Sequence, residues 1–162
     1  MYSIDYHRPI SNLSWLSKLL ERAVCTQLVS YLNVNSLMRR HQSAHRRRHS
    51  TDTALAFVFY ELISALDDGN LVLMALLDLS AAFDCIDHNI SRLNITYGIG
   101  NTVHSWISSY LSGSTRSLRV DGASSRAETM QYGVPQGSVL GPLLFLLYTA
   151  DLDAIVTNHG FM

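Results

Sequence analysis

Apolar residues recur every three or four positions over two stretches in the first half of the chain, which is the pattern of an amphipathic helix. Residues 13–32 form the first stretch and residues 54–66 the second. Asp-Asp-Gly-Asn at 67–70 ends the second stretch, because glycine and short polar side chains favour turns. We therefore predict two helices, separated by a polar, basic loop at 33–49. The candidate N-caps share a short polar side chain and are Ser11, Asn12 or Ser14 for the first helix and Ser50 or Thr51 for the second.

A run that is apolar on both faces, LVLMALLD at 71–78, predicts a buried central strand, since it is short and follows a turn. The other predicted elements are an extended segment at 1–10, an irregular helix at 81–97, a helix at 102–111, a hairpin made by 115–121 and 126–131 around Gly122, and one strongly apolar helix at 139–155. Helices and strands mixed in this way indicate an α+β layer fold.

Composition narrows the class of protein. The chain has 162 residues, the length of one domain or of a fragment of a larger one. Apolar residues make up 48% of it and charged residues 15%, which is too apolar for a disordered chain. With a net charge of −1 it has no overall positive field to attract nucleic acid, although five of its eleven arginines lie within 39–48.

The sequence also bears on the compartment. Its longest apolar run, 139–148, is about half the length of a membrane span, so we predict no membrane partner. The N-terminus has no signal-peptide pattern, and Cys25 and Cys85 are neither a disulfide framework nor a metal pair. These features predict an intracellular protein, in the nucleus or the cytoplasm.

Three segments carry candidate chemistry, and each has an ordinary structural alternative. Asp78, Asp84 and Asp87 are carboxylates that can bind Mg²⁺, or else they end a strand and cap a helix. The Gly-Val-Pro-Gln-Gly-Ser loop at 133–138 can present helix N–H groups to an anion, or else it ends in a Ser138 cap. The basic loop at 39–49 can bind phosphates, or else it is a solvated surface.

Taken together and in order, four segments resemble the reverse transcriptase domain of non-LTR (LINE-like) retrotransposons. The segments are RPISN at 8–12 with Lys18, Leu20 and Glu21, similar to the family's RPIS followed by K-x-x-E; QSAHRRRHST at 42–51, similar to QSAYRxGHST; LLDLSAAFD at 76–84 with Asp87 and His88, similar to motif A; and GVPQGSVLGPLLF at 133–145, similar to motif B. The resemblance covers nearly the whole chain, and the last two segments are highly specific.

The resemblance implies a right-hand polymerase of which the chain, 1–162, is a partial reverse transcriptase domain, with the fingers at about 1–70 and part of the palm at about 71–162. It implies templated transfer of deoxynucleoside monophosphate to a primer 3′-OH with two Mg²⁺ ions. The implied partners are an RNA template, a DNA primer and a deoxynucleoside triphosphate.

The resemblance also assigns roles residue by residue. Asp78 matches the catalytic metal ligand of motif A, and the backbone carbonyl of Leu79 is a second oxygen donor. Phe83 matches a steric gate against the ribose 2′-OH. The remaining matches are Arg46 at the incoming triphosphate, Gln136 and Gly137 beside the template and the nascent base pair, and Arg39, Arg40, Arg47 and Arg48 as nucleic-acid contacts.

Departures from the family pattern set the expectation for activity. The family's paired aspartates, Tyr/Phe-Ala-Asp-Asp, do not follow motif B before Met162, and Asp78 alone does not hold two Mg²⁺ ions. Arg48 stands where the family favours glycine. We therefore expect a truncated domain that is inactive alone; the alternatives are a non-catalytic nucleic-acid-binding module and a non-functional fragment.

Overall fold

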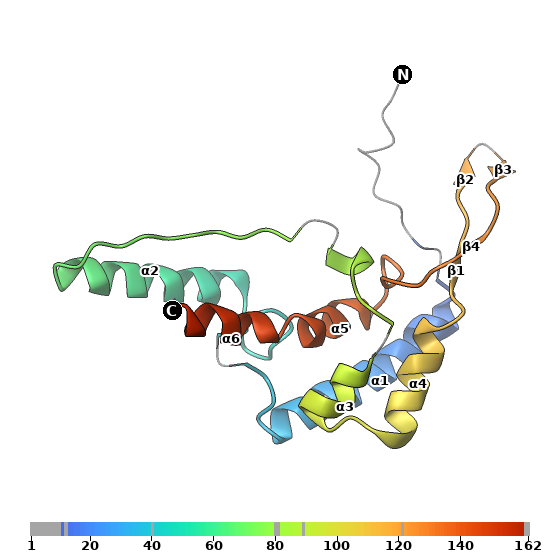
Figure 1. Cartoon of the computed structure of the whole chain (residues 1–162), viewed down its shortest axis with the longest axis horizontal. Coiled ribbons are helices and arrows are strands. Elements are labelled where there is room, and N and C mark those ends of the chain that lie inside the picture. The colour runs from blue at the N-terminus through green and yellow to red at the C-terminus, as the bar shows by residue number, and fades with distance from the viewer. Residues whose placement is uncertain are drawn as a thin grey trace. The chain divides into compact units, whose positions relative to one another are not determined.

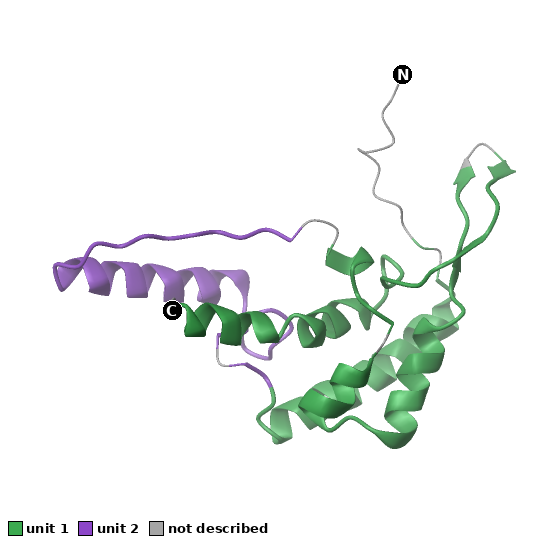
Figure 2. Ribbon diagram, in the orientation of Figure 1, with its two compact units in different colours: residues 1–37, 81–162 green, residues 38–80 purple. Residues whose placement is uncertain are grey.

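Two units make up the fold of the computed structural model, which describes residues 11, 13–39, 41–79, 82–88, 90–120 and 122–160. Unit 1 combines residues 1–37 with 81–162, and unit 2 is residues 38–80 (Figure 2). The expected extended segment at 1–10 lies outside the described residues. The proposed division into fingers and palm near residue 70 stays a prediction.

Unit 1 contains most of the helices (Figure 1). They are α1 (Trp15–Val34), the 3-10 turn η2 (Ala82–Asp84), α3 (Ser91–Tyr97), α4 (Asn101–Leu111), α5 (Gly141–Tyr148) and α6 (Asp151–Asn158). The first predicted helix is confirmed as α1, and Ser14 is its cap, because its side chain accepts a hydrogen bond from the Ser17 amide. The helix expected at 102–111 is confirmed as α4.

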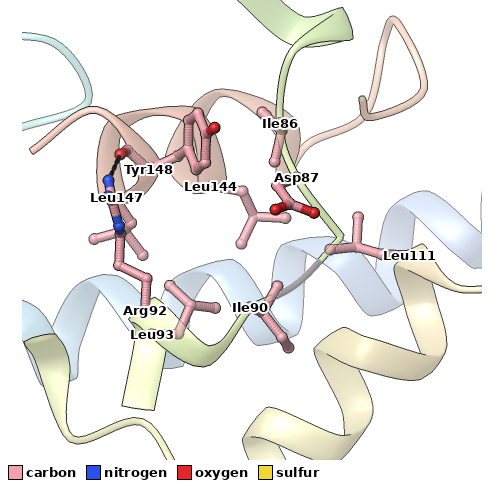
Figure 3. Close-up of a pocket in the computed structure, with 9 residues that line it drawn as sticks. All are labelled: Ile86, Asp87, Ile90, Arg92, Leu93, Leu111, Leu144, Leu147 and Tyr148. Atoms are coloured by element: carbon pink, nitrogen blue, oxygen red, sulfur yellow. Dashed lines mark hydrogen bonds between the residues drawn. The ribbon is translucent and has the colours of Figure 1, made fainter. Parts of the chain in front are cut away.

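The buried apolar side chains of the described residues all belong to unit 1. They come from the second half of α1 (Leu28 and Leu32), from residues 86–99, from α4 and from 134–147. Figure 3 shows Ile90, Leu93 and Leu111 meeting Leu144 and Leu147 of α5 around a pocket of about 20 Å³. This pocket has room for about one water molecule, so it does not accommodate a nucleotide.

A long hairpin follows α4, as predicted. Strand β1 (Thr115–Arg116) pairs with β4 (Glu128–Thr129), and β2 (Arg119–Val120) pairs with β3 (Ala123–Ser124), both antiparallel. Three residues separate β3 from β4 but two separate β1 from β2, so the ladder contains a bulge. The fold is therefore mixed, with helices and one small sheet region, in agreement with the coarse α+β expectation.

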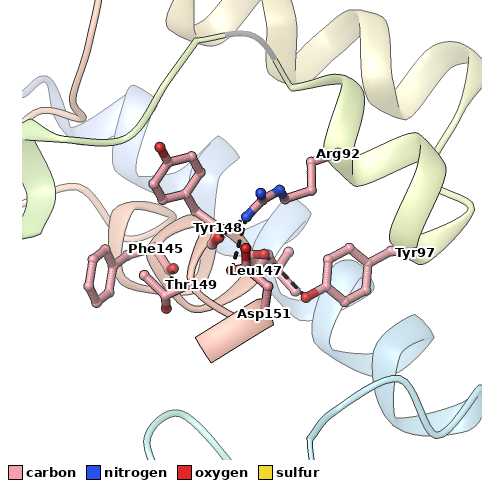
Figure 4. Close-up of polar contacts among 7 residues, drawn as sticks. All are labelled: Arg92, Tyr97, Phe145, Leu147, Tyr148, Thr149 and Asp151. Carbon is pink, nitrogen blue, oxygen red and sulfur yellow. Dashed lines mark hydrogen bonds and ion pairs between the residues drawn. The ribbon is translucent and has the colours of Figure 1, made fainter. Parts of the chain in front are cut away.

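The single helix expected at 139–155 is wrong, because the chain breaks between α5 and α6. Side chains from α3 take the carbonyls that would continue the helix: Tyr97 Oη donates to the Leu147 carbonyl at 3.2 Å and Arg92 Nη1 to the Tyr148 carbonyl at 2.6 Å (Figure 4). The Arg92 guanidinium also lies 5.5 Å from the centre of the Tyr148 ring and pairs with Asp151 at 3.1 Å. A cation at a helix C-terminus is favourable, so Arg92 stabilises this break.

The irregular helix expected at 81–97 is likewise two elements, η2 and α3, with non-helical residues between them. Backbone pairing explains the interruption: the Ile86 carbonyl accepts from Gly133 and Asp87 forms an isolated bridge with Tyr132, so this segment is held by a distant loop. Within the described residues, no helix is both long and apolar enough to cross a bilayer.

Unit 2 consists of a loop, the helix α2 (Thr51–Asp67) and an extended segment. The second predicted helix is confirmed as α2, and Ser50 is its cap through a reciprocal capping box with Thr53. None of its described residues is buried, so the apolar stripe seen in the sequence has no covering partner within the described part of the unit.

The buried central strand expected at 71–78 is wrong. The structure has no strand at 71–79, and Leu71, Leu73 and Leu77 are at least 88% exposed. A strand is buried only when neighbours pair both of its edges and cover both of its faces, and no described residue pairs with this segment. The strong hydrophobicity that motivated the prediction is therefore left on an exposed, extended chain.

Candidate functional site

The motif B loop, residues 133–140, is held directly against the end of motif A. The Val134 amide donates to the Phe83 carbonyl at 2.9 Å, and the Gly133 amide donates to the Ile86 carbonyl at 2.7 Å. His88 adds a third link, with its Nε2 atom 2.7 Å from the Gly133 carbonyl. Two segments that are about 50 residues apart in the sequence are thus joined through their backbones in unit 1.

Gly133 makes this approach possible. Its φ is +87°, a left-handed conformation that favours glycine, and a Cβ there would lie 3.0 Å from both the Asp84 Cα and the Phe83 carbonyl oxygen. The close contact places Phe83 beside the loop, with its ring 5.8 Å from that of Phe145 in α5 and 38% of the residue exposed. The structure therefore brings the steric-gate candidate next to the loop that carries Gln136 and Gly137.

A buried carboxylate anchors the other end of the loop. Glu21 of α1 is 1% exposed, and its Oε2 atom accepts hydrogen bonds from the Ser138 hydroxyl at 2.9 Å, the Val139 amide at 2.6 Å and the Leu140 amide at 3.3 Å. The Ser138 oxygen in turn accepts from the Gly141 amide at 2.9 Å. The first turn of α5 is thus capped by groups from two distant parts of the sequence.

These contacts decide between the two interpretations of the loop. The expectation that its helix N–H groups face an external anion is wrong, because the Val139 and Leu140 amides already bind the carboxylate of Glu21. The alternative, a cap formed by Ser138, agrees with the structure. Helix N-termini favour negative charge, and here the chain supplies that charge itself.

The surroundings of Glu21 shift the pKa values of two neighbouring groups. Burial raises the pKa of Tyr110 to about 12, and the charge of Glu21 adds to the rise; the Tyr110 Oη atom lies 2.8 Å from the Ser138 hydroxyl. Burial also raises the pKa of the Cys25 thiol, again with a contribution from Glu21. Both groups therefore stay protonated at neutral pH, and Tyr110 is available as a hydrogen-bond donor to Ser138.

Glu21 is the important residue whose role the sequence did not reveal. The family resemblance included it in K-x-x-E without a function. A signal was present: Glu21 shares the buried face of α1 with Leu28 and Leu32, at spacings of seven and eleven residues. A charged residue on an inward-facing stripe is costly unless it is hydrogen-bonded, so its position predicts a specific partner.

The basic candidates of unit 2 lie on the loop before α2. Arg46 is half-buried as a residue, and its Nη1 atom donates to the Arg39 carbonyl at 3.3 Å. Arg39, Arg47 and Arg48 are exposed, and Arg40 lies outside the described residues. The loop is thus partly ordered around Arg46 and presents its other described arginines to solvent.

Arg48 shows why the family favours glycine at its position. Its φ is +65°, in the left-handed region where a side chain is disfavoured by about 1–2 kcal/mol. The departure from the family pattern therefore has a local cost in conformational energy. His45, on the same loop, also lies in the left-handed region, with a φ of +57°.

The metal-ligand candidates Asp78 and Leu79 lie at the end of the exposed, extended segment 71–79, where Leu79 is 49% exposed. Among the described residues, no group of three or more His, Cys, Asp or Glu side chains could hold a metal ion. A pair of Mg²⁺ ions needs several oxygen ligands around it. Asp78 with the Leu79 carbonyl does not fit such a pair, so no metal-dependent step is assigned to this chain by itself.

The structure thus joins the end of motif A to the motif B loop within unit 1. The chain belongs to the reverse transcriptase (RNA-dependent DNA polymerase) family, whose sequence model matches residues 4–160. Divalent metal ions are general in this family. No solved structure gives a significant match to the chain.

Several curated proteins are similar to it over nearly its whole length. It is 35% identical to the probable RNA-directed DNA polymerase from transposon BS of Drosophila melanogaster, over 97% of this chain and 17% of that protein. It is 34% identical to the corresponding protein from transposon X-element of the same species, over 90% of the chain and 16% of that protein. It is 31% identical to the RNA-directed DNA polymerase from mobile element jockey of Drosophila funebris, over 92% of this chain and 16% of that protein.

These relatives are polymerases of non-LTR retrotransposons, which confirms the resemblance seen in the sequence. The chain spans 16–17% of the length of these relatives. It is therefore a segment of a reverse transcriptase domain of retrotransposon origin.

Proposed function

We propose that this chain supplies the fingers and part of the palm of an RNA-directed DNA polymerase, and that the whole polymerase copies an RNA template onto a DNA primer. The observation that carries the proposal is the backbone pairing of Phe83 with Val134, which sets the end of motif A beside the motif B loop. Both motifs take part in nucleotide selection in the family, so their contact supports a shared site.

In this proposal, unit 1 contributes the surface for the incoming nucleotide and the template. Phe83 excludes a ribonucleotide, because its ring stands where the 2′-OH would lie. Gln136 and Gly137 lie beside the template and the nascent base pair, where glycine permits close approach. Gly137 is exposed and a Cβ on it would have no protein atom closer than 4.0 Å, so the space beside it is open to a ligand.

Unit 2 contributes phosphate contacts and one metal ligand. Arg46 meets the triphosphate, for which a planar guanidinium is well suited. Arg39, Arg40, Arg47 and Arg48 contact the nucleic-acid backbone. Asp78 and the Leu79 carbonyl are the two oxygen donors that match the family, and they would need further ligands to hold Mg²⁺.

Primer extension tests the activity of the 162-residue chain. With an annealed DNA primer on an RNA template, deoxynucleoside triphosphates and Mg²⁺, we expect no synthesis, because one carboxylate does not bind two metal ions. Robust extension that is abolished by Asp78→Asn would overturn the expected inactivity while supporting the polymerase assignment.

Binding tests the assignment itself. A primer–template duplex should bind with an affinity that falls steeply with salt, since phosphate contacts release counterions. Replacing Arg46, Arg47 and Arg48 by Ser should reduce the slope of log K against log salt by about one for each phosphate contact that the substitutions remove. Arg22→Ser, on an exposed position of α1, is the control and should leave the slope unchanged. Binding that is absent or independent of salt would contradict the proposal.

A further inference from the structure

We propose that Glu21 is a positioning residue for the template. It acts by fixing the backbone of Gln136 and Gly137 through its hydrogen bonds to the residues that follow them. This inference rests on the proposed function of those two residues and adds the part of the chain that holds them. The proposed function uses only motifs A and B and the basic loop, so Glu21 and the segment before it are left without a role.

The N-terminal part of the chain binds the loop on both sides of Gly137, at Gln136 and at Ser138. On one side, the Ser11 amide donates to the Gln136 carbonyl at 3.1 Å. On the other side, the Glu21 carboxylate binds Ser138 and Val139. We call these two contacts the α1 clamp. Only Gly137 lies between the two attachment points, so the clamp defines where this exposed glycine is presented.

Gly137 needs such support. Its φ is +95°, and glycine has more backbone freedom than any other residue, so this conformation is not selected by local sterics. A surface that contacts a base pair must hold its shape before the ligand arrives, because an unordered loop loses affinity when it becomes ordered. The α1 clamp supplies that order, through Glu21 on helix α1 and through Ser11 in the segment before it.

The burial of Glu21 indicates that the clamp is more than a helix cap. Among the described residues, no basic side chain forms an ion pair with Glu21. Burying a carboxylate without a cation is unfavourable unless several donors satisfy it, and here the donors all come from 138–140, apart from a long contact of 3.4 Å with Ser17. Since Ser138 already receives the Gly141 amide, a cap alone does not require this charge.

Tyr110 extends the clamp to α4. Its hydroxyl lies 2.8 Å from that of Ser138, whose proton is directed to Glu21, so Tyr110 is left to donate to the Ser138 oxygen. The hydroxyl of Ser138, the residue after Gly137, is thus hydrogen-bonded to residues of three helices, α1, α4 and α5. Side chains in such a network act together, and we expect their substitutions to be non-additive.

The test uses Glu21→Gln in the full chain, with Glu61→Gln on the exposed face of α2 as the matched control. Two properties are measured: amide hydrogen exchange at Val139 and Leu140, and affinity for an RNA–DNA duplex with and without a single-stranded RNA template overhang. We expect Glu21→Gln to accelerate exchange at both amides by about tenfold, because it removes charge-assisted hydrogen bonds.

Comparing the duplex that has an overhang with the blunt duplex distinguishes a loss of template positioning from a general loss of stability. If Glu21 positions the template, Glu21→Gln lowers affinity for the overhang duplex by about tenfold and changes affinity for the blunt duplex by less than about twofold. Glu61→Gln should change neither. Faster exchange with an unchanged preference for the overhang would overturn the proposal, because Glu21 would then be structural only.

Other outcomes distinguish this inference from the proposed function. If the unaltered chain binds neither duplex, the proposed function fails and the inference fails with it. If the unaltered chain prefers the overhang and Glu21→Gln keeps that preference, only the inference fails. Should Glu21→Gln not fold, Tyr110→Phe, which removes one hydroxyl from the same network, must reduce the preference for the overhang; an unchanged preference would overturn the proposal.

Discussion

Replacing Gly133 by alanine should destabilise unit 1 and separate the two motifs that form the candidate site. The change adds one methyl group at a position where φ is +87° and where the backbone of Phe83 and Asp84 approaches to 3.0 Å from the added Cβ. The obstacle is backbone rather than a flexible side chain. It can therefore move only if the hydrogen bonds at Gly133 and Val134 stretch.

Two costs add up in this variant. A residue with a Cβ in the left-handed region costs about 1–2 kcal/mol. Forcing a methyl group into a filled space costs about 1–3 kcal/mol more, because neighbours must shift. The sum, about 2–5 kcal/mol, is a large part of the roughly 5–15 kcal/mol that typically holds a domain together. For a chain of this length it corresponds to a fall of roughly 4–20 °C in the melting midpoint.

The assay is thermal unfolding followed by circular dichroism, with Gly113→Ala as the control. Gly113 has a similar φ of +72°, but no atom lies within 4 Å of the place that a Cβ would take, so that variant isolates the conformational cost of about 1–2 kcal/mol. The difference between the two variants then measures the close contact itself. If Gly133→Ala lowers the midpoint no more than Gly113→Ala does, the reasoning about the approach of motif A is refuted.

Three further predictions follow from single contacts. Ser50→Ala removes the acceptor of the Thr53 amide and should weaken the start of α2 by about 1 kcal/mol, seen as about fivefold faster exchange at Thr53; unchanged exchange would contradict the cap. Arg92→Ala should lower the melting midpoint by a few degrees by freeing the end of α5, whereas Asp151→Asn, which removes only an exposed ion pair, should change it little; equal effects would argue against the carbonyl contact. Because the folded pKa of Tyr110, about 12, lies above its ordinary value near 10, the folded state holds a proton that the unfolded state releases, so stability is fully present below pH 10 and falls between pH 10 and 12. Denaturant unfolding across this range should show a shallower fall for Tyr110→Phe, and identical slopes would contradict the shift.

The helices that could be predicted from the sequence are those defined by local signals. Helix α2 begins at a capping box and ends at an Asp-Gly turn, so both of its limits are encoded within a few residues. Helix α1 is predicted by the three-and-four spacing of its apolar residues, which is also a local signal. This spacing does not predict burial equally well: Leu16 and Leu20 of α1 are exposed, although they lie in the apolar pattern.

The elements for which the prediction is wrong depend on distant partners. The hydrophobicity of 71–79 is that of a buried strand, yet a strand exists only where other backbone pairs with it, and the sequence does not state where that backbone is. The break after Tyr148 has the same origin. Nothing within 139–155 requires it, and it results from Arg92 and Tyr97, which lie about 50 residues earlier in the chain.

The candidate site shows the same division between what is local and what is not. Motifs A and B could be recognised as strings of residues, but their contact depends on the backbone of one glycine, and the other end of the motif B loop is held by a carboxylate 117 residues away from the serine that it binds. Glu21 could have been singled out from physics alone, because a carboxylate on the inward face of a helix must have donors, and among the described residues no basic side chain forms an ion pair with it. In the structure those donors are the Val139 and Leu140 amides at the start of α5, where a glycine, a proline and an apolar run predict a helix N-terminus. The inward acidic residue and the helix start can therefore both be recognised in the amino-acid sequence, whereas their pairing is a product of the fold, which joins the first motif of the family to motif B.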